Sequence, residues 1–158
     1  MKKVINIPRI MAKEWKNDPG DCAWVSISEP GEPQTMISNL FLDKLPTLHI
    51  ALWDLEEPIK HEGKTLWPMG RIDTLNLFNF LIKNKDKSII VNCAAGISRS
   101  GAVARFCEDY LGYEWMDLNG IGKSAAMPNR AIYRMLAREY ENRFEEIEPA
   151  YVGQIQPK

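Results

Sequence analysis

The two side chains best suited to chemistry in this sequence are a cysteine and an arginine six residues apart. Cys93 stands at the end of an apolar run that predicts a buried strand, and Arg99 opens a segment that predicts a helix. A thiolate is a nucleophile, and a planar guanidinium forms a bidentate hydrogen bond with two oxygens of a phosphoryl group. The spacing therefore predicts a phosphate-binding site that holds a nucleophile.

The loop between these two residues adds to the same chemistry. It reads Ala94-Ala95-Gly96-Ile97-Ser98 and leads into a helical turn that holds Arg99 and Ser100. Backbone N–H groups in a tight glycine-containing loop form a cradle for anions, and the helix dipole adds about half a positive charge. Phosphate and thiolate are both anions, so we expect the loop to bind phosphate and to favour the thiolate form of Cys93.

The elements around this loop predict an α/β fold. Short apolar and β-branched runs are typical of strands at 4–7, 23–27, 47–53 and 88–91. Apolar spacing and stop signals predict helices at 11–16, 71–83, 101–111 and 129–146. Because apolar strands alternate with helices, we expect a central, mostly parallel sheet of about four to five strands with helices on both faces. Ligands bind at the carboxyl ends of such strands, where Cys93 and the loop after Trp53 lie.

Composition places the chain among globular proteins of one domain. It has 158 residues, of which 45% are hydrophobic and 26% charged. We expect a single domain over 1–158, with its core at about 4–146 and a short tail at 147–158. A net charge of −1 argues against a general field for nucleic acid or anionic lipid, and no run of 18 apolar residues predicts a membrane span. We therefore expect no binding to nucleic acid or membranes, and we further expect a monomer.

The cysteines and histidines predict no metal site. Cys22, Cys93 and Cys107 are odd in number and widely spaced, which fits neither a disulfide framework nor paired zinc ligands. His49 lies in a predicted strand and His61 in a polar loop, without a ligand spacing. With no apolar signal core near the N-terminus, these observations favour a reducing cytoplasm.

The motif Cys-x5-Arg-Ser, from Cys93 to Ser100, resembles the active-site signature of the protein tyrosine phosphatases. Its place about three fifths along the chain, after a strand and before two helices, resembles the small dual-specificity phosphatases of that superfamily. The resemblance implies a cofactor-free hydrolase of phosphotyrosine in proteins or peptides, with phosphoserine and phosphothreonine as further candidates. The uncharged residues inside the loop favour a phosphorylated side chain over a phosphoinositide.

The resemblance also implies a role for each residue of the motif. Cys93 attacks phosphorus and becomes a phosphocysteine, while Arg99 and the loop amides hold the charge of the transition state. Ser100 stabilises the thiolate as a leaving group when water cleaves that intermediate.

The family further needs a carboxylic acid that protonates the leaving oxygen and then activates water. Asp54 is the candidate, because it follows a strand about forty residues before the nucleophile, with Trp53 at its side. Glu56 and Glu57 remain alternatives.

Two asparagines are expected to support the loop. Asn92 stands where the family commonly has histidine, a departure expected to tune the thiolate, and Asn129 is expected to brace the loop from a later segment. Two other functions stay open. One is a pseudophosphatase that binds phosphorylated partners, which the departure at Asn92 favours. The other is a rhodanese-like sulfurtransferase, which also uses an anion-binding loop that begins with cysteine.

Overall fold

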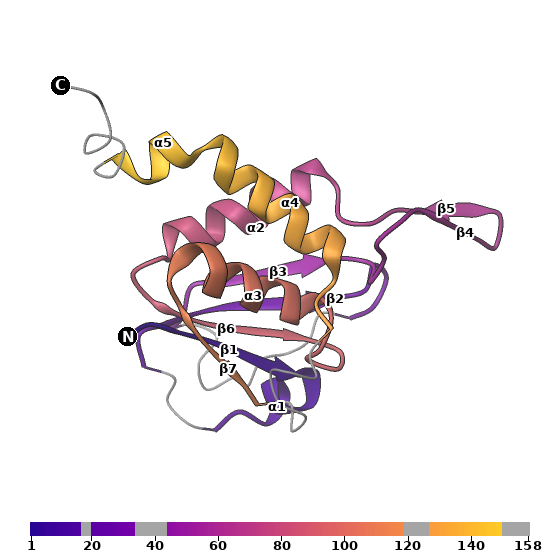
Figure 1. The fold of residues 1–158 in the computed structure, drawn as a ribbon. Helices are drawn as coiled ribbons and strands as arrows, with labels where there is room; N and C mark the ends of the chain where they lie inside the picture. The colour runs from indigo at the N-terminus through magenta and orange to yellow at the C-terminus, as the bar shows by residue number, and fades with distance from the viewer. Residues whose placement is uncertain (17–19, 34–43, 119–126, 150–158) are drawn as a thin grey trace.

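The computed structural model describes residues 1–16, 20–33, 44–118 and 127–149. Its centre is a five-stranded sheet in which each neighbouring pair of strands is parallel. The order across the sheet is β3-β2-β6-β1-β7, with β1 at Lys3–Pro8, β2 at Cys22–Ser28, β3 at Thr47–Ala51, β6 at Ser88–Cys93 and β7 at Glu114–Asp117 (Figure 1). The predicted α/β fold with a parallel central sheet is confirmed.

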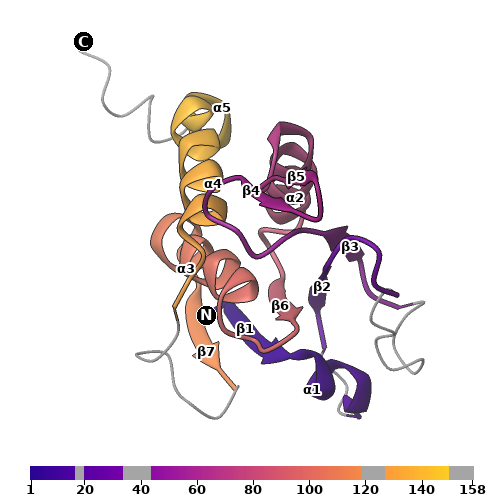
Figure 2. The same cartoon turned by 90° about the vertical axis from the view of Figure 1, so that its right-hand side faces the viewer.

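Helices lie on both faces of this sheet. On one face lie α2, α3 and α4, and α1 lies on the other, as two views at right angles show (Figures 1 and 2). Their bounds are Arg9–Glu14 for α1, Arg71–Lys83 for α2, Arg99–Leu111 for α3 and Arg130–Asn142 for α4, and α4 is followed by α5 at Phe144–Ile147. Each apolar strand serves both faces, because successive side chains alternate. Ile89 and Val91 join the larger core under α2 and α3, whereas Ile90 packs with Trp24 and Ala12 on the α1 face.

A small antiparallel hairpin stands apart from the sheet. It consists of β4 at Ile59–His61 and β5 at Lys64–Leu66, and it projects to one side of the molecule (Figure 1). Its two turn residues, Glu62 and Gly63, both have positive φ, at 49° and 75°, as a type I′ turn requires. The sequence predicts a polar loop around His61, so the hairpin is an addition to the predicted fold.

The last predicted helix is divided in two. The expected span of 129–146 ends at Asn142 and resumes at Phe144. Arg143, at φ −113° and ψ 16°, breaks the helix, and its guanidinium is held by Asn79 and Glu146 over the ring of Phe78. Within the described ranges, no helix has both the length and the apolar composition that crossing a membrane requires.

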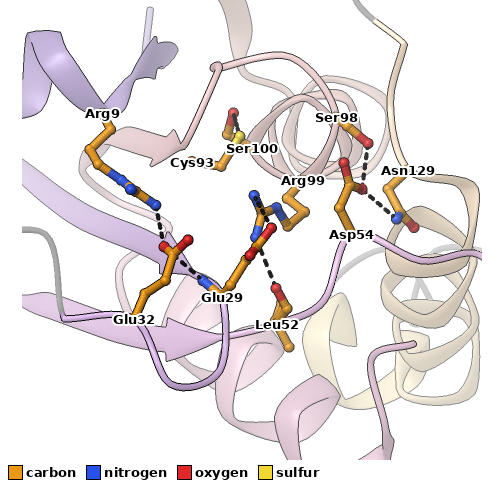
Figure 3. A network of polar contacts seen from close by, with 10 residues as sticks. All are labelled: Arg9, Glu29, Glu32, Leu52, Asp54, Cys93, Ser98, Arg99, Ser100 and Asn129. Carbon is orange, nitrogen blue, oxygen red and sulfur yellow. Dashed lines mark hydrogen bonds and ion pairs between the residues drawn. The ribbon is translucent and has the colours of Figure 1, made fainter. Parts of the chain in front are cut away.

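All five strands of the sheet point the same way, so their carboxyl ends share one edge. The loops that follow β2, β3 and β6 meet at this edge, together with the start of α1 directly after β1. Figure 3 shows side chains from all four segments beside one another. The carboxyl edge is therefore where the predicted site residues can meet.

Candidate active site

Cys93 is the last residue of β6, the middle strand of the sheet, and its side chain is 2% exposed. Five loop residues separate it from α3, which begins at Arg99. The Cys93 Sγ atom lies 3.1 Å from the Ser100 Oγ atom in the first turn of that helix. The thiol therefore lies at the N-terminal end of α3, within hydrogen-bond distance of a hydroxyl group.

Strand β1 holds the loop in its tight shape. Gly96 has φ +68°, and a Cβ atom built on it would lie 2.5 Å from the backbone nitrogen of Pro8. The buried Asn6 side chain donates a 2.8 Å hydrogen bond from Nδ2 to the Gly96 carbonyl, and the Arg9 amide donates to the Ala94 carbonyl at 3.2 Å. The loop is thus pressed against, and bonded to, the end of the neighbouring strand.

Asn6 is a supporting residue that the sequence analysis missed. A fully buried asparagine among the apolar residues of β1 needs hydrogen-bond partners. Its position in the middle of an apolar run was a signal that such a partner exists. The identity of the partner depends on the pairing of β1 with β6, which brings the loop to it.

Asn92 does not support the loop as the sequence analysis expected. Its Oδ1 atom accepts a 2.8 Å hydrogen bond from Nε1 of Trp24, a residue of the core on the α1 face. Cys93 belongs instead to the core on the α3 face. Adjacent residues in a strand point to opposite faces, so Asn92 turns away from the thiol and fixes Trp24.

Arg99 is buried, with 4% of its surface exposed. Described residues form hydrogen bonds with only part of its guanidinium group. Its Nη1 group donates to the Leu52 carbonyl at 2.9 Å, and Nη2 lies 3.9 Å from the Glu29 carboxylate. Its Nε–H group is buried and has no hydrogen-bond partner among the described residues. Two loops therefore hold the side chain and leave its Nε–H group without a partner among the described residues.

A second arginine is linked to the same acidic loop. Arg9 donates to the Glu32 carboxylate at 2.6 Å, and this carboxylate also accepts from the Glu29 amide at 3.4 Å. The hydrogen bond from Arg9 lowers the pKa of Glu32. In Figure 3, Cys93 and Arg99 lie between this pair and the carboxylate of Asp54. The loop after β2 thus reaches both arginines, a contact that the sequence analysis did not foresee.

Asp54 lies at the edge of the loop that follows Cys93. Its Oδ1 atom accepts hydrogen bonds from the Ser98 hydroxyl at 2.7 Å and from Asn129 Nδ2 at 2.9 Å. Its side chain is exposed to solvent. The structure therefore brings the predicted acid into contact with the predicted phosphate loop.

Asn129 connects three parts of the site. Its amide donates to the Ser98 carbonyl at 3.0 Å, its Nδ2 group donates to Asp54, and its Oδ1 atom accepts from the Ile132 amide as the N-cap of α4. Substitution at this position would disturb the loop, the carboxylate and the helix start together. The geometry fits the bracing position expected for it.

The two alternative acids are placed differently from Asp54. Glu56 forms a fork with Arg130, at 2.9 Å to Nε and 2.7 Å to Nη2. These hydrogen bonds lower the pKa of Glu56 and hold its carboxylate on Arg130. Glu57 is exposed and makes no hydrogen bond or ion pair with any residue in the described ranges. Asp54 is the carboxylate in contact with the loop.

The other cysteines and the histidines lie away from this cluster. Cys22 starts β2, opposite Ser88, at the far end of the strands from Cys93. Cys107 is fully buried in α3, and burial raises the pKa of its thiol. Burial also lowers the pKa of His49, in β3, and His61 is exposed in the hairpin. No group of three or more metal-ligating side chains forms within the part of the chain that the structure describes.

No protein-family model matches this chain, and no curated protein matches it. Among solved structures, the chain is similar to the human tyrosine phosphatase-like serine/threonine/tyrosine-interacting protein, with 17% sequence identity and a TM-score of 0.48. The match covers 88% of this chain and 93% of that one.

Proposed function

We propose that this chain is a cysteine-dependent phosphatase of proteins or peptides that hydrolyses phosphotyrosine, with phosphoserine and phosphothreonine as further substrates. The observation that carries the proposal is the meeting of a buried thiol, a buried guanidinium and a carboxylate at the carboxyl edge of the sheet. The unpaired Nε–H of Arg99 adds to it, because buried donors are normally satisfied and a phosphoryl oxygen would satisfy this one.

The loop amides support the same ligand. The amides of Ala95, Ile97 and Ser98 donate no hydrogen bond to any other described residue. They belong to a short loop whose glycine has positive φ and which ends at the N-terminus of α3. Amides of this kind stabilise the equatorial oxygens of a phosphoryl group during transfer.

In the first step, the Cys93 thiolate attacks phosphorus in line with the leaving oxygen. The new S–P bond forms as the P–O bond breaks, and the electron pair of that bond goes to the tyrosine oxygen. Asp54, in its protonated form, donates its proton to that oxygen. Arg99 and the loop amides hold the three oxygens of the phosphoryl group meanwhile.

In the second step, water attacks the phosphocysteine. The Asp54 carboxylate takes a proton from the water, the S–P bond breaks, and inorganic phosphate is released. The electron pair of that bond returns to sulfur, where the Ser100 hydroxyl, at 3.1 Å, donates a hydrogen bond to the thiolate. The cycle needs no metal ion or redox partner.

The test is turnover of p-nitrophenyl phosphate and of a phosphotyrosine peptide by wild type, Cys93→Ser and Cys107→Ala. We expect Cys93→Ser to abolish turnover but still to bind a phosphate-like oxyanion such as tungstate, because the amides and Arg99 remain. Cys107→Ala is the matched control, since that thiol is buried within α3 away from the loop. Hydrolysis by Cys93→Ser at more than a few per cent of the wild-type rate would rule out the covalent mechanism.

The same experiment separates the other two functions. A pseudophosphatase would bind the phosphotyrosine peptide without turnover in the wild type. A sulfurtransferase would instead move sulfur from thiosulfate to cyanide and leave the aryl phosphate intact. The phosphocysteine intermediate is checked by acid quenching of the reaction with a radiolabelled aryl phosphate. We expect radioactive phosphate bound to the wild-type protein and none bound to Cys93→Ser.

A further inference from the structure

A hollow of about 300 Å³ lies beside the loop that carries Asp54. Its walls come from the end of β3, from β5 with the segment that follows it, and from the start of α2. Trp53, Trp67 and Met69 are apolar residues of its lining, and Asp73 is the acidic residue among them. The volume is at the lower end of the range for ligand pockets, so it suits a single side chain.

The hollow shares a wall with the candidate active site. Leu52 lines it, and the carbonyl of the same residue accepts the 2.9 Å hydrogen bond from Arg99. Trp53 also lines it and directly precedes Asp54 in the chain. An extended peptide advances about 3.3 Å per residue. A peptide whose phosphorylated residue lies at the loop therefore brings only residues close to it in sequence to the hollow.

The charge among the described residues that line the hollow is negative. Asp73 is half-buried and makes no hydrogen bond or ion pair with any described residue. None of the described residues that line the hollow is a lysine, arginine or histidine. The nearest arginine in sequence, Arg71, pairs with Glu139 at 3.2 Å. Asp73 lies in the first turn of α2, so a cation that binds beside it gains an ion pair with a carboxylate that no described residue occupies.

The aromatic lining suits the same kind of ligand. Trp67 is 64% exposed although it is a large apolar side chain, and Trp53 is half-buried beside the same space. Indole faces attract ammonium and guanidinium groups more strongly than other aromatic rings do. The methylene stem of a lysine or arginine packs on apolar surface while its charged end reaches a polar partner.

We infer that this hollow is a substrate subsite that binds a lysine or arginine side chain near the phosphorylated residue. The side-chain stem lies against Trp53 and Trp67, and its cation pairs with Asp73. The inference rests on the proposed function for the position of the phosphorylated residue. It adds a substrate class, which is phosphotyrosine with a basic neighbour.

The kinetic test uses phosphotyrosine peptides that carry lysine, norleucine or glutamate at one position within three residues of the phosphotyrosine. Norleucine keeps the stem of lysine and removes the charge. We expect one position at which the lysine peptide has a kcat/KM about five- to tenfold above the norleucine peptide, with the glutamate peptide lowest. The ratio should fall to within about twofold in Asp73→Asn and be largely kept in Asp73→Glu.

Two further variants locate the effect. Trp67→Ala should reduce the lysine preference without reversing it. Glu62→Gln removes an exposed carboxylate from the turn of the same hairpin, outside the hollow, and should leave the preference unchanged. Equal kcat/KM for lysine and norleucine at every position would overturn the inference, as would a norleucine preference or a lysine preference that survives Asp73→Asn.

A binding measurement separates this inference from the proposed function. The same peptides, labelled with a fluorophore, are titrated into wild type and Asp73→Asn and followed by anisotropy. If no substrate is hydrolysed but the lysine peptide binds about five- to tenfold more tightly and loses this advantage in Asp73→Asn, the subsite stands and the phosphatase proposal fails. If p-nitrophenyl phosphate is hydrolysed and the peptides bind alike, the phosphatase proposal stands and the subsite fails. Failure of every peptide to bind overturns the subsite.

Discussion

Gly96→Ala tests how closely the phosphate loop is fitted to strand β1. The new methyl carbon would lie 2.5 Å from the Pro8 nitrogen, 2.6 Å from the Ile7 carbonyl carbon and 2.9 Å from the Ile7 oxygen. All three are backbone atoms of β1, a strand that is paired on both sides, with β6 and with β7. Since the strand cannot move cheaply, the loop must move away from it.

Two costs set the size of the effect. Alanine at φ +68° costs about 1–2 kcal/mol, because a side chain disfavours the left-handed region. Displacement of the loop breaks the buried 2.8 Å hydrogen bond from Asn6, and a buried donor left unpaired costs about 1–3 kcal/mol. We therefore expect Gly96→Ala to lower the free energy of unfolding by about 2–5 kcal/mol. In a domain of this size that lowers Tm by about 4–20 °C.

The matched control is Gly112→Ala. Gly112 caps α3 with φ +73° and has no atom within 4 Å of the position of a new Cβ, so it bears the backbone cost alone. Chemical denaturation of both variants gives the difference that the close approach to β1 causes. Turnover of p-nitrophenyl phosphate should fall in Gly96→Ala and be kept in Gly112→Ala. Equal losses of stability in the two variants would refute the reasoning.

Three further substitutions test individual side chains. Asp54→Asn should slow phosphotyrosine hydrolysis about 10²–10³-fold but slow an aryl phosphate with an acidic leaving group much less; equal loss on both substrates would point to another acid. Arg99→Lys should lower kcat/KM by weakening both binding and chemistry, because an ammonium lacks the planar fork, and wild-type kinetics would remove Arg99 from the site. Glu56→Gln should lower Tm at neutral pH and not in acid. Since Arg130 lowers the pKa of Glu56 in the folded state, the pair stabilises the fold above the unfolded-state pKa and loses that contribution as the pH falls through the folded value. A Tm difference that persists in acid would contradict this assignment.

The elements that could be predicted are those whose apolar residues face the core. Helix α2 matches its predicted bounds, because Leu77, Phe78 and Leu81 are buried at helical spacing and Lys83 precedes a polar stop. The β4–β5 hairpin escaped prediction because all three residues of β4 are exposed and leave no alternating pattern. Its one local signal is the Glu62-Gly63 turn. Edge strand β7, with four residues, is likewise too short for a clear period.

The candidate site divides in the same way. The nearness of Cys93, Arg99 and Ser100 follows from their spacing in one strand, loop and helix, so the sequence alone could predict it. The contacts of Asn6 and Glu29 depend on strand order, which places β1 and β2 on either side of β6. No local sequence pattern indicates the order of the strands in the sheet.

Asn92 shows a different kind of limit. Its place beside the nucleophile in sequence suggested a direct effect on the thiol. The alternation of side chains along β6 puts it on the opposite face instead, where it holds Trp24. Knowledge of the strand therefore corrects what the neighbouring position in the motif implied.

The pairing of β1 with β6 has a consequence for the order in which the protein is made. Pro8 lies beside Cys93, and a ribosome that adds about 5–20 residues per second needs about 4–17 s to synthesise the chain between them. During that interval the apolar strand β1 has no β6 to pair with, and the loop has no wall to close against. The loop that holds Cys93 is therefore completed late in synthesis, after β1 has remained without its partner strand β6. Slowing translation before residue 88 would lengthen the time in which a chaperone could bind β1.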